Sequence, residues 1–111
     1  MSDLDVLRRV SKTLSERKVA DAGTSYVSSL YAKGTDAICK KVAEEAAETI
    51  MAAKDGDGPH LVYEVADLWF HSLVLLSHHG LSVDDVVAEF SRREGVSGIE
   101  EKKSRRKEAQ G

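Results

Sequence analysis

Apolar residues recur every three or four positions along most of this chain, which is the spacing that lines one face of an α-helix. Residues that commonly begin or end helices divide this pattern into segments. Ser25 and Ser82 are suited to cap helix N-termini, and Gly80 is suited to end a helix. Thr35 or Asp36 can cap a longer helix between them. The expected helices cover about residues 3–18, 25–32, 35–54, 59–79 and 82–94, with a first break at residues 20–23.

The clearest turn signal is the run Asp-Gly-Asp-Gly at residues 55–58, followed by Pro59. Glycine permits a positive φ, aspartate favours turns, and proline suits the first turn of a helix. We therefore expect the two longest helices to form a tight antiparallel hairpin. The second of them is apolar on most of its circumference, which predicts burial on every side. Its apolar residues are Leu61, Val62, Val65, Leu68, Trp69, Phe70, Leu73, Val74, Leu75 and Leu76.

Length and composition support one all-α domain. The chain has 111 residues and a single proline, so we expect one domain over residues 1–111 with one core over about residues 3–94. From Gly95 onward the chain is polar and locally basic, and we interpret residues 95–111 as a solvated, flexible tail. The fold class predicted from the sequence is all-α.

Charge and cysteine content narrow the partners and the compartment. A net charge of -3 gives no overall attraction to nucleic acid or to an anionic membrane, so neither is expected as a partner. Cys39 is the single cysteine, which excludes an intramolecular disulfide and a cysteine-based zinc site. The N-terminus shows no apolar signal segment, and no apolar run reaches the roughly 18 residues of a membrane span. We expect a cytoplasmic protein.

Acidic residues flank the predicted turn on both sides and fall on the apolar sides of their helices. At about 100° per residue, Glu45 and Glu48 share a side with Ile38 and Ala52. Glu64 and Asp67 share a stripe with Leu68 on the most apolar helix. We therefore expect these acids to lie away from the solvated face, where an unpaired charge is costly.

The hairpin places the four acids at matching heights. Glu48 and Glu64 each lie eight residues from Gly56, and Glu45 and Asp67 each lie eleven residues from it. Antiparallel helices with a rise of about 1.5 Å per residue would set each pair level on facing surfaces. Four crowded carboxylates repel one another unless a cation lies among them, and an all-oxygen set favours magnesium, with manganese as the alternative. A site of this kind suits a metal-bound polyphosphate, so the expected partner is a small-molecule nucleotide.

Four other interpretations of these acidic residues are less well supported by the sequence. Acidic pairs on helices usually form salt bridges with lysines on a solvated face, but two mirrored pairs on apolar stripes make that reading less favourable here. A di-iron bundle needs histidine three residues after a ligand glutamate, and neither cluster has one. An EF-hand loop beginning at Asp55 would need glutamate at its twelfth position, which is Ala66. A non-catalytic helical interaction module remains as an alternative from a different class.

The motifs Glu44-Glu45-x-x-Glu48 and Glu64-x-x-Asp67 resemble the metal signature of the MazG-like all-α nucleoside triphosphate pyrophosphohydrolases. Their surroundings, from Ser25-Tyr26 and Lys33-Gly34 onward, are similar to the phosphoribosyl-ATP pyrophosphatase family of histidine biosynthesis over about residues 4–105. One departure is Ala43, where that family usually has glycine. The resemblance implies a helical bundle around the central hairpin, completed by oligomerisation into a homo-oligomer built from dimers.

The resemblance also implies the reaction, which is hydrolysis of 1-(5-phosphoribosyl)-ATP to 1-(5-phosphoribosyl)-AMP and pyrophosphate with magnesium. A related enzyme that hydrolyses ordinary or damaged nucleoside triphosphates would share the metal site and is the nearest alternative. The expected metal ligands are Glu45, Glu48, Glu64 and Asp67.

Further roles follow for residues around the metal ligands. Glu44 lies about 40° from Glu48 around the helix and either orients the attacking water or is a surface acid, so the expected catalytic residues are Glu44, Glu45 and Glu48. Lys33, Lys41 and Ser25 are the expected substrate-binding residues. His71 lies on the stripe of Glu64, but a lone histidine on an apolar face is more often a hydrogen-bonded core residue than a ligand, so it is left out of the metal site.

Overall fold

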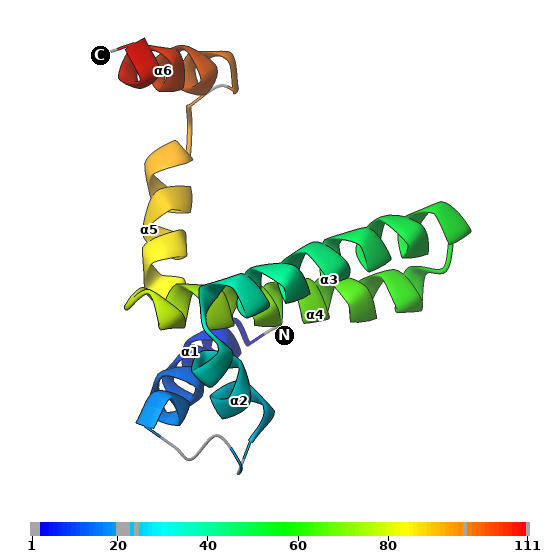
Figure 1. The fold of residues 1–111 in the computed structure, drawn as a ribbon. Helices are drawn as coiled ribbons and strands as arrows, with labels where there is room; N and C mark the ends of the chain where they lie inside the picture. Colours follow the sequence, from blue (N-terminus) through cyan, green and yellow to red (C-terminus); the bar gives the residue numbers. More distant parts are fainter. Residues whose placement is uncertain (1–2, 20–22, 24, 97, 111) are drawn as a thin grey trace.

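The computed structural model describes residues 3–19, 23, 25–96 and 98–110, and for residues 107–110 it describes the backbone alone (Figure 1). Every regular element in these residues is helical, which confirms the all-α prediction, although the predicted break at residues 20–23 lies mostly outside them. The elements are α1 (Asp5–Glu16), the 3₁₀-helix η1 (Arg17–Val19), α2 (Tyr26–Lys33), α3 (Thr35–Asp55), α4 (Gly58–His78), α5 (Val83–Arg93) and α6 (Gly98–Gln110).

The predicted hairpin is confirmed. Helices α3 and α4 run antiparallel along one another, and two residues connect them (Figure 1). Gly56 ends α3 in the left-handed conformation with φ 74°, which glycine adopts without the steric cost of a Cβ. The Asp57 carboxylate then accepts a hydrogen bond of 3.1 Å from the backbone N–H of His60 and so caps α4. This short turn fixes the register between the two long helices.

The other helix starts agree with the sequence in two cases out of three. The Ser25 hydroxyl accepts from the backbone N–H of Ser28 at 3.0 Å, and Ser82 begins α5 in a capping box with Asp85. For α3 the prediction was wrong, because the N-cap is Gly34, with φ 93°, rather than Thr35 or Asp36. A single residue connects α2 to α3, so both predicted caps already lie in the first turn of α3.

The hydrophobic core lies at one end of the hairpin. There α1, α2 and the start of α5 meet the N-terminal half of α3 and the C-terminal half of α4 (Figure 1). Its buried residues are Leu14, Leu30, Ile38, Leu73, Val74 and Val83. We call this packed end of the hairpin, around these six residues, the base. The base holds the two long helices in place, while the other halves of the helices project away from it.

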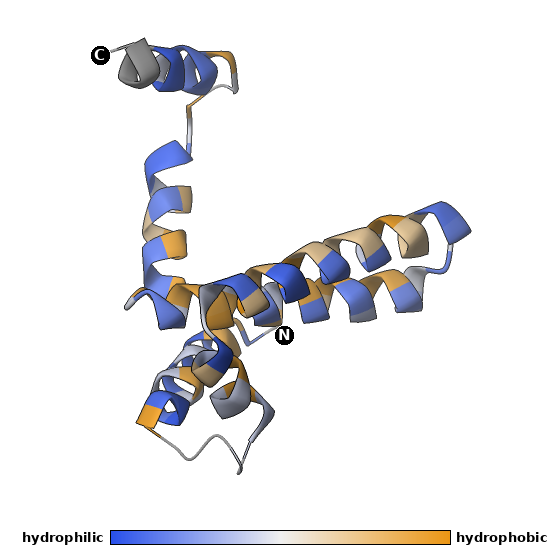
Figure 2. Ribbon diagram, in the orientation of Figure 1, coloured by the Kyte–Doolittle hydropathy of each residue, from blue (hydrophilic) through white to orange (hydrophobic). Residues whose placement is uncertain are grey.

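The projecting half of the hairpin carries apolar residues on both helices (Figure 2), and several of them are exposed. The single chain therefore does not supply the burial on every side that the apolar residues of α4 predict. Among the described residues, α3 is the helix that runs along this half of α4 (Figure 1). The large apolar residues left exposed on the two helices are Ile50, Met51, Val62, Tyr63 and Trp69.

The C-terminal segment is a helix rather than the expected flexible tail. Helix α5 leads away from the base and α6 lies across its far end (Figure 1). Arg92 on α5 donates a hydrogen bond of 2.7 Å to Glu101 on α6, which is 8% exposed. Arg105, one turn further along α6, also faces Glu101 at 3.6 Å. Arg105, one of the basic residues of this segment, thus pairs with Glu101, and Arg92 joins α5 to α6 through the same carboxylate.

Among the described residues, none of the helices is both long enough and apolar enough to cross a membrane.

Candidate metal centre

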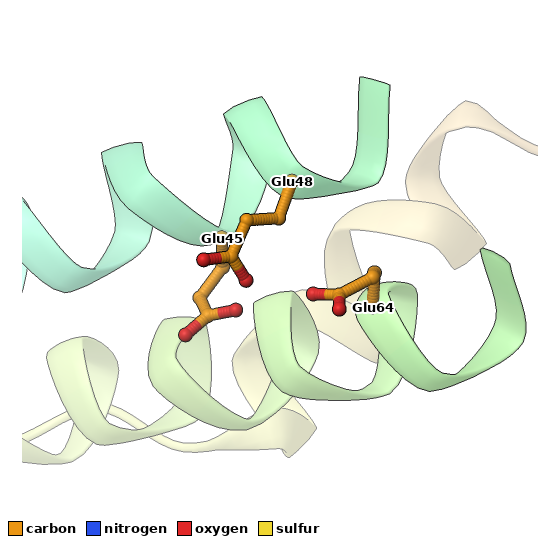
Figure 3. A group of neighbouring side chains, drawn as sticks. All are labelled: Glu45, Glu48 and Glu64. Atoms are coloured by element: carbon orange, nitrogen blue, oxygen red, sulfur yellow. The ribbon is translucent and has the colours of Figure 1, made fainter. Parts of the chain in front are cut away.

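Three carboxylates converge between the two long helices. Glu45 and Glu48 extend from α3 toward α4, and Glu64 extends from α4 toward them (Figure 3). One oxygen from each lies within 4.8 Å of the others. The tight turn at Gly56 produces this convergence, because it sets the acids of α3 level with those of α4.

Burial differs among the three. Glu45 is 7% exposed and Glu64 is 6% exposed, although each carries a carboxylate. Glu48 is exposed, so the prediction that it lies away from solvent is wrong. Its side chain extends toward α4 (Figure 3), but it remains exposed. Two carboxylates of the cluster are therefore buried, and the third is exposed on a side that is open to a ligand.

The two buried carboxylates each leave one oxygen without a hydrogen-bond partner among the described residues. These atoms are Oε2 of Glu45 and Oε2 of Glu64. Buried polar atoms are nearly always paired, so an orphaned carboxylate oxygen indicates a missing partner. Neighbouring carboxylates cannot fill that role, since they are acceptors when ionised.

The pKa values of the buried acids move in the direction that this crowding requires. Burial raises the pKa of Glu45, and repulsion from Glu48 and Asp67 raises it further. Burial likewise raises the pKa of Glu64, with Glu48 as its principal acidic neighbour. Each ionised form is thus disfavoured in the folded chain without a cation. Glu48 acts on both and is the electrostatic centre of the group.

Asp67, the fourth predicted ligand, does not belong to this three-carboxylate group. It lies half-buried on α4, and its charge acts on Glu45. The sequence predicts that Glu48 lies level with Glu64 and that Glu45 lies level with Asp67. The electrostatic interactions follow this pairing, because Glu48 raises the pKa of Glu64 and Asp67 raises the pKa of Glu45. Asp67 borders the cluster from the side of Glu45.

Two histidines contact the cluster. His60 Nε2 lies 3.1 Å from Oε1 of Glu64. This contact was not predicted from the sequence, although residues four positions apart lie on the same side of a helix. His71 is 6% exposed and is hydrogen-bonded through both ring nitrogens, to the carbonyl of Asp67 and to the hydroxyl of Tyr26. The interpretation of His71 as a hydrogen-bonded core histidine is confirmed.

Basic residues border the cluster on the α3 side. Lys41 Nζ lies 3.4 Å from a carboxylate oxygen of Glu44. Tyr26 and the hydrogen bond to Glu44 both raise the pKa of Lys41, which keeps it cationic. Glu44 is exposed and is not one of the three clustered carboxylates, and Lys33 is exposed at the end of α2. Lys41 is the predicted cation that lies nearest to the acids.

A surface hollow of about 480 Å³ lies between α1 and α2. Ser25 and Tyr26 contribute to its lining, and so do Arg9 and Arg17, while its floor is apolar. Tyr26 also contacts His71, whose Nδ1 lies 3.9 Å from Glu45. Tyr26 and His71 thus connect the lining of the hollow to the carboxylate cluster.

The donor set fits a hard divalent cation. Carboxylate oxygens are the ligands that magnesium and manganese prefer, and three of them come from facing rigid helices. The orphaned buried oxygens and the raised pKa values both indicate a site that lacks positive charge. One residue from α4 and two from α3 would hold such a cation.

Comparison with known proteins gives concordant results. The family described as phosphoribosyl-ATP pyrophosphohydrolase matches residues 7–94. A protein of Azoarcus sp. (strain BH72) named phosphoribosyl-ATP pyrophosphatase is 78% identical over 106 residues, which covers 96% of this chain and 99% of that protein. A protein of the same name from Aromatoleum aromaticum is 79% identical over 105 residues, covering 95% and 97%. A third, from Chromobacterium violaceum, is 62% identical over 102 residues, covering 92% and 94%.

Proposed function

The chain belongs to the phosphoribosyl-ATP pyrophosphohydrolase family, and on this basis we propose that it hydrolyses 1-(5-phosphoribosyl)-ATP to 1-(5-phosphoribosyl)-AMP and pyrophosphate. This is the second step of histidine biosynthesis, and we propose a cytoplasmic location for it. The observation that carries the proposal is the convergence of Glu45, Glu48 and Glu64 in a chain that matches the family across the whole hairpin. A small-molecule substrate of this kind requires neither nucleic acid nor a membrane.

We propose that the reaction depends on magnesium, with manganese as a substitute. Glu45, Glu48 and Glu64 would hold the cation, and Asp67 would add a ligand or a further negative charge beside Glu45. When bound, the cation supplies positive charge to the phosphate oxygens as charge develops on them during hydrolysis. The orphaned oxygens of Glu45 and Glu64 support this proposal, because they are buried and lack any other partner in the described chain.

Residues around the cluster would position the other reactants. Glu44, exposed beside Lys41, is available to orient the attacking water or to accept its proton. Attack of water on the α-phosphorus would form the new P–O bond of phosphoribosyl-AMP. The bond from this phosphorus to the oxygen that bridges the α and β phosphates would break, and pyrophosphate would leave with that oxygen. Fixed placement of water and phosphate on rigid helices is what the hairpin contributes.

We propose that Lys33, Lys41 and Ser25 bind substrate. Lys41 lies beside the acids and is held cationic, so it is suited to phosphate. Ser25, together with Arg9 and Arg17, lines the hollow between α1 and α2. This hollow is open at the surface and is connected to the cluster through Tyr26 and His71. Lys33 is exposed at the end of α2, and its support is the match to the family around Lys33-Gly34.

We further propose a homo-oligomer built from dimers. The five large apolar side chains exposed on α3 and α4 are each between 56% and 70% exposed. Exposed apolar groups of this kind on a stable chain indicate a surface that another protein covers. A second copy is the partner that is always present at matching concentration. Sedimentation that shows a well-folded monomer at micromolar concentration would contradict this proposal.

The deciding experiment measures pyrophosphate release from phosphoribosyl-ATP and from the common nucleoside triphosphates, each with and without magnesium. We expect release from phosphoribosyl-ATP with magnesium and a much lower kcat/KM for ATP. Comparable kcat/KM values for the two would indicate a less selective nucleoside triphosphate pyrophosphohydrolase. Equal rates with a chelator and with magnesium would contradict the metal dependence while leaving the substrate assignment intact.

A further inference from the structure

His71 connects two parts of the molecule that the proposed function uses separately. Its ring is 6% exposed and lies between the Tyr26 hydroxyl, at the edge of the surface hollow, and the carboxylate of Glu45. The Tyr26 and His71 rings meet edge to face with centroids 5.8 Å apart, and the Phe70 ring closes another side at 5.3 Å. A polar ring enclosed in this way has its orientation fixed by its neighbours.

The hydrogen bonds of His71 determine which ring nitrogen carries the hydrogen. Nδ1 lies 3.0 Å from the backbone oxygen of Asp67, which can only accept, so Nδ1 must donate. In the neutral ring Nε2 then has a lone pair and accepts from the Tyr26 hydroxyl at 2.9 Å. Tyr26 therefore favours the same tautomer that the carbonyl of Asp67 requires.

This tautomer places an N–H bond next to the candidate metal ligand. Oε1 of Glu45 lies 3.9 Å from Nδ1, too far for a second hydrogen bond but close enough for attraction between the carboxylate and the N–H dipole. Oε2 of the same carboxylate has no partner in the described chain. One oxygen thus faces a positive edge of His71, and the other is left for a cation. The opposite tautomer would turn a lone pair toward both the carbonyl and the carboxylate.

We propose that Tyr26 and His71 act as a positioning pair for Glu45, fixing its carboxylate in the orientation that binds the divalent cation. The proposal rests on the proposed metal centre. Outer partners that orient a ligand commonly change metal affinity by about 10- to 100-fold when they are removed. Tyr26 is well placed for such a role, because it is the only one of the three groups in this chain of contacts that reaches the surface hollow.

The test measures the dissociation constant for Mn²⁺ of the substrate-free protein, by calorimetry or electron paramagnetic resonance. Tyr26→Phe removes the hydroxyl and keeps the ring, and we expect it to weaken Mn²⁺ binding about tenfold. Tyr31→Phe is the matched control, because its hydroxyl makes a similar 2.9 Å hydrogen bond, to the backbone carbonyl of Leu14 and away from the cluster's ligands. Equal Mn²⁺ affinity in the two variants would overturn the proposal.

Two further variants separate positioning from general packing. His71→Leu should weaken Mn²⁺ binding at least as much as Tyr26→Phe, and the double variant should be no weaker than His71→Leu, because both changes break one chain of contacts. His71→Asn keeps an amide N–H near the position of Nδ1 and should retain more affinity than His71→Leu. Additive losses in the double variant would overturn the proposal. If His71→Leu fails to fold, Tyr26→Phe and His71→Asn still decide the question.

The outcome for the wild-type chain distinguishes the two levels of inference. If the wild-type protein does not bind Mn²⁺, the proposed metal centre fails and the positioning pair fails with it. If it binds Mn²⁺ and Tyr26→Phe binds equally well, only the positioning pair fails. Circular dichroism and melting temperature for each variant show whether any loss of affinity comes from unfolding.

Discussion

Glu45 and Glu64 lie between α3 and α4, where no described side chain pairs with their orphaned oxygens, whereas Glu89 and Glu101 lie where α5 meets α6 and are surrounded by arginines. Burial and neighbouring acids raise the pKa values of the first pair. Hydrogen bonds from Arg92 and Arg93 lower the pKa of Glu89 to about 2, and Arg92 also lowers that of Glu101. The pKa values of similar side chains are thus shifted in opposite directions within one chain.

The two regions therefore differ in role. The acids of the hairpin are suited to binding a cation, whereas the acids at the junction of α5 and α6 support the structure. At the junction of α5 and α6, each carboxylate has a cationic partner at 3.0 Å or less, and the ion pairs help to hold α6 in place. In the hairpin, the repulsion is relieved only if something positive enters. A folded chain that tolerates such repulsion trades some stability for binding. The following predictions test whether this contrast is real.

The largest effect is expected on catalysis. Glu45→Gln, Glu48→Gln, Glu64→Gln and Asp67→Asn each keep the side-chain shape and remove one negative charge. We expect each to lower kcat/KM by at least about a hundredfold, because each weakens the hold on the cation. Glu89→Gln is the matched control from the structural region and should retain near-normal kcat/KM. Pyrophosphate release measures both, and comparable activity in the two sets would remove the distinction.

A second effect is expected on the response to metal. The proposed magnesium site exists in the folded chain and not in the unfolded chain, so magnesium at about 100 times its dissociation constant should add about 2.7 kcal/mol to the free energy of unfolding. Glu45→Gln should abolish most of this gain, whereas Glu101→Gln should keep it. Melting temperatures with magnesium and with a chelator measure the gain. A gain that survives in Glu45→Gln would place the cation elsewhere.

A smaller effect is expected on the stability of the metal-free protein, with opposite signs in the two regions. Glu48→Gln removes the charge that raises the pKa of both buried acids, so the melting temperature should stay the same or rise. Arg92→Gln leaves Glu89 and Glu101 without their partner, so the melting temperature should fall, by a few degrees at most for such exposed pairs. Hydrogen exchange in α6 should increase in Arg92→Gln alone.

The smallest effect is expected in the pH dependence. A raised carboxyl pKa means that the folded chain keeps its proton longer than the unfolded chain, so Glu45 and Glu64 destabilise the metal-free fold as pH rises through the carboxyl range. For Glu89 the sign is reversed, because stability is present above the ordinary carboxyl pKa and is lost as pH falls toward about 2. The melting-temperature difference between Glu64→Gln and wild type should therefore shrink from about pH 7 to about pH 4. A constant difference would contradict the raised pKa.

Much of the fold and part of the site followed from local sequence. The turn at Gly56 and Asp57, the caps at Ser25 and Ser82, and the facing acids of the hairpin all depend on residues close together along the chain. Local hydrogen bonds and helical periodicity act over a few residues, so the amino-acid types alone determine them. The convergence of Glu45, Glu48 and Glu64 is predictable for the same reason, because a two-residue turn fixes the register.

Tertiary structure alone decided which faces are covered and which distant side chains meet. Periodicity gives the angle of Glu48 around α3, but its exposure depends on how far neighbouring helices extend over the groove. The contact of Tyr26 with His71 joins residues 45 positions apart, and Arg92 orders α6 through Glu101 across a helix junction. The apolar residues of α4 indicate burial, yet Val62, Tyr63 and Trp69 on this helix are exposed. Such contacts depend on how complete helices pack together, which no single segment of the sequence specifies.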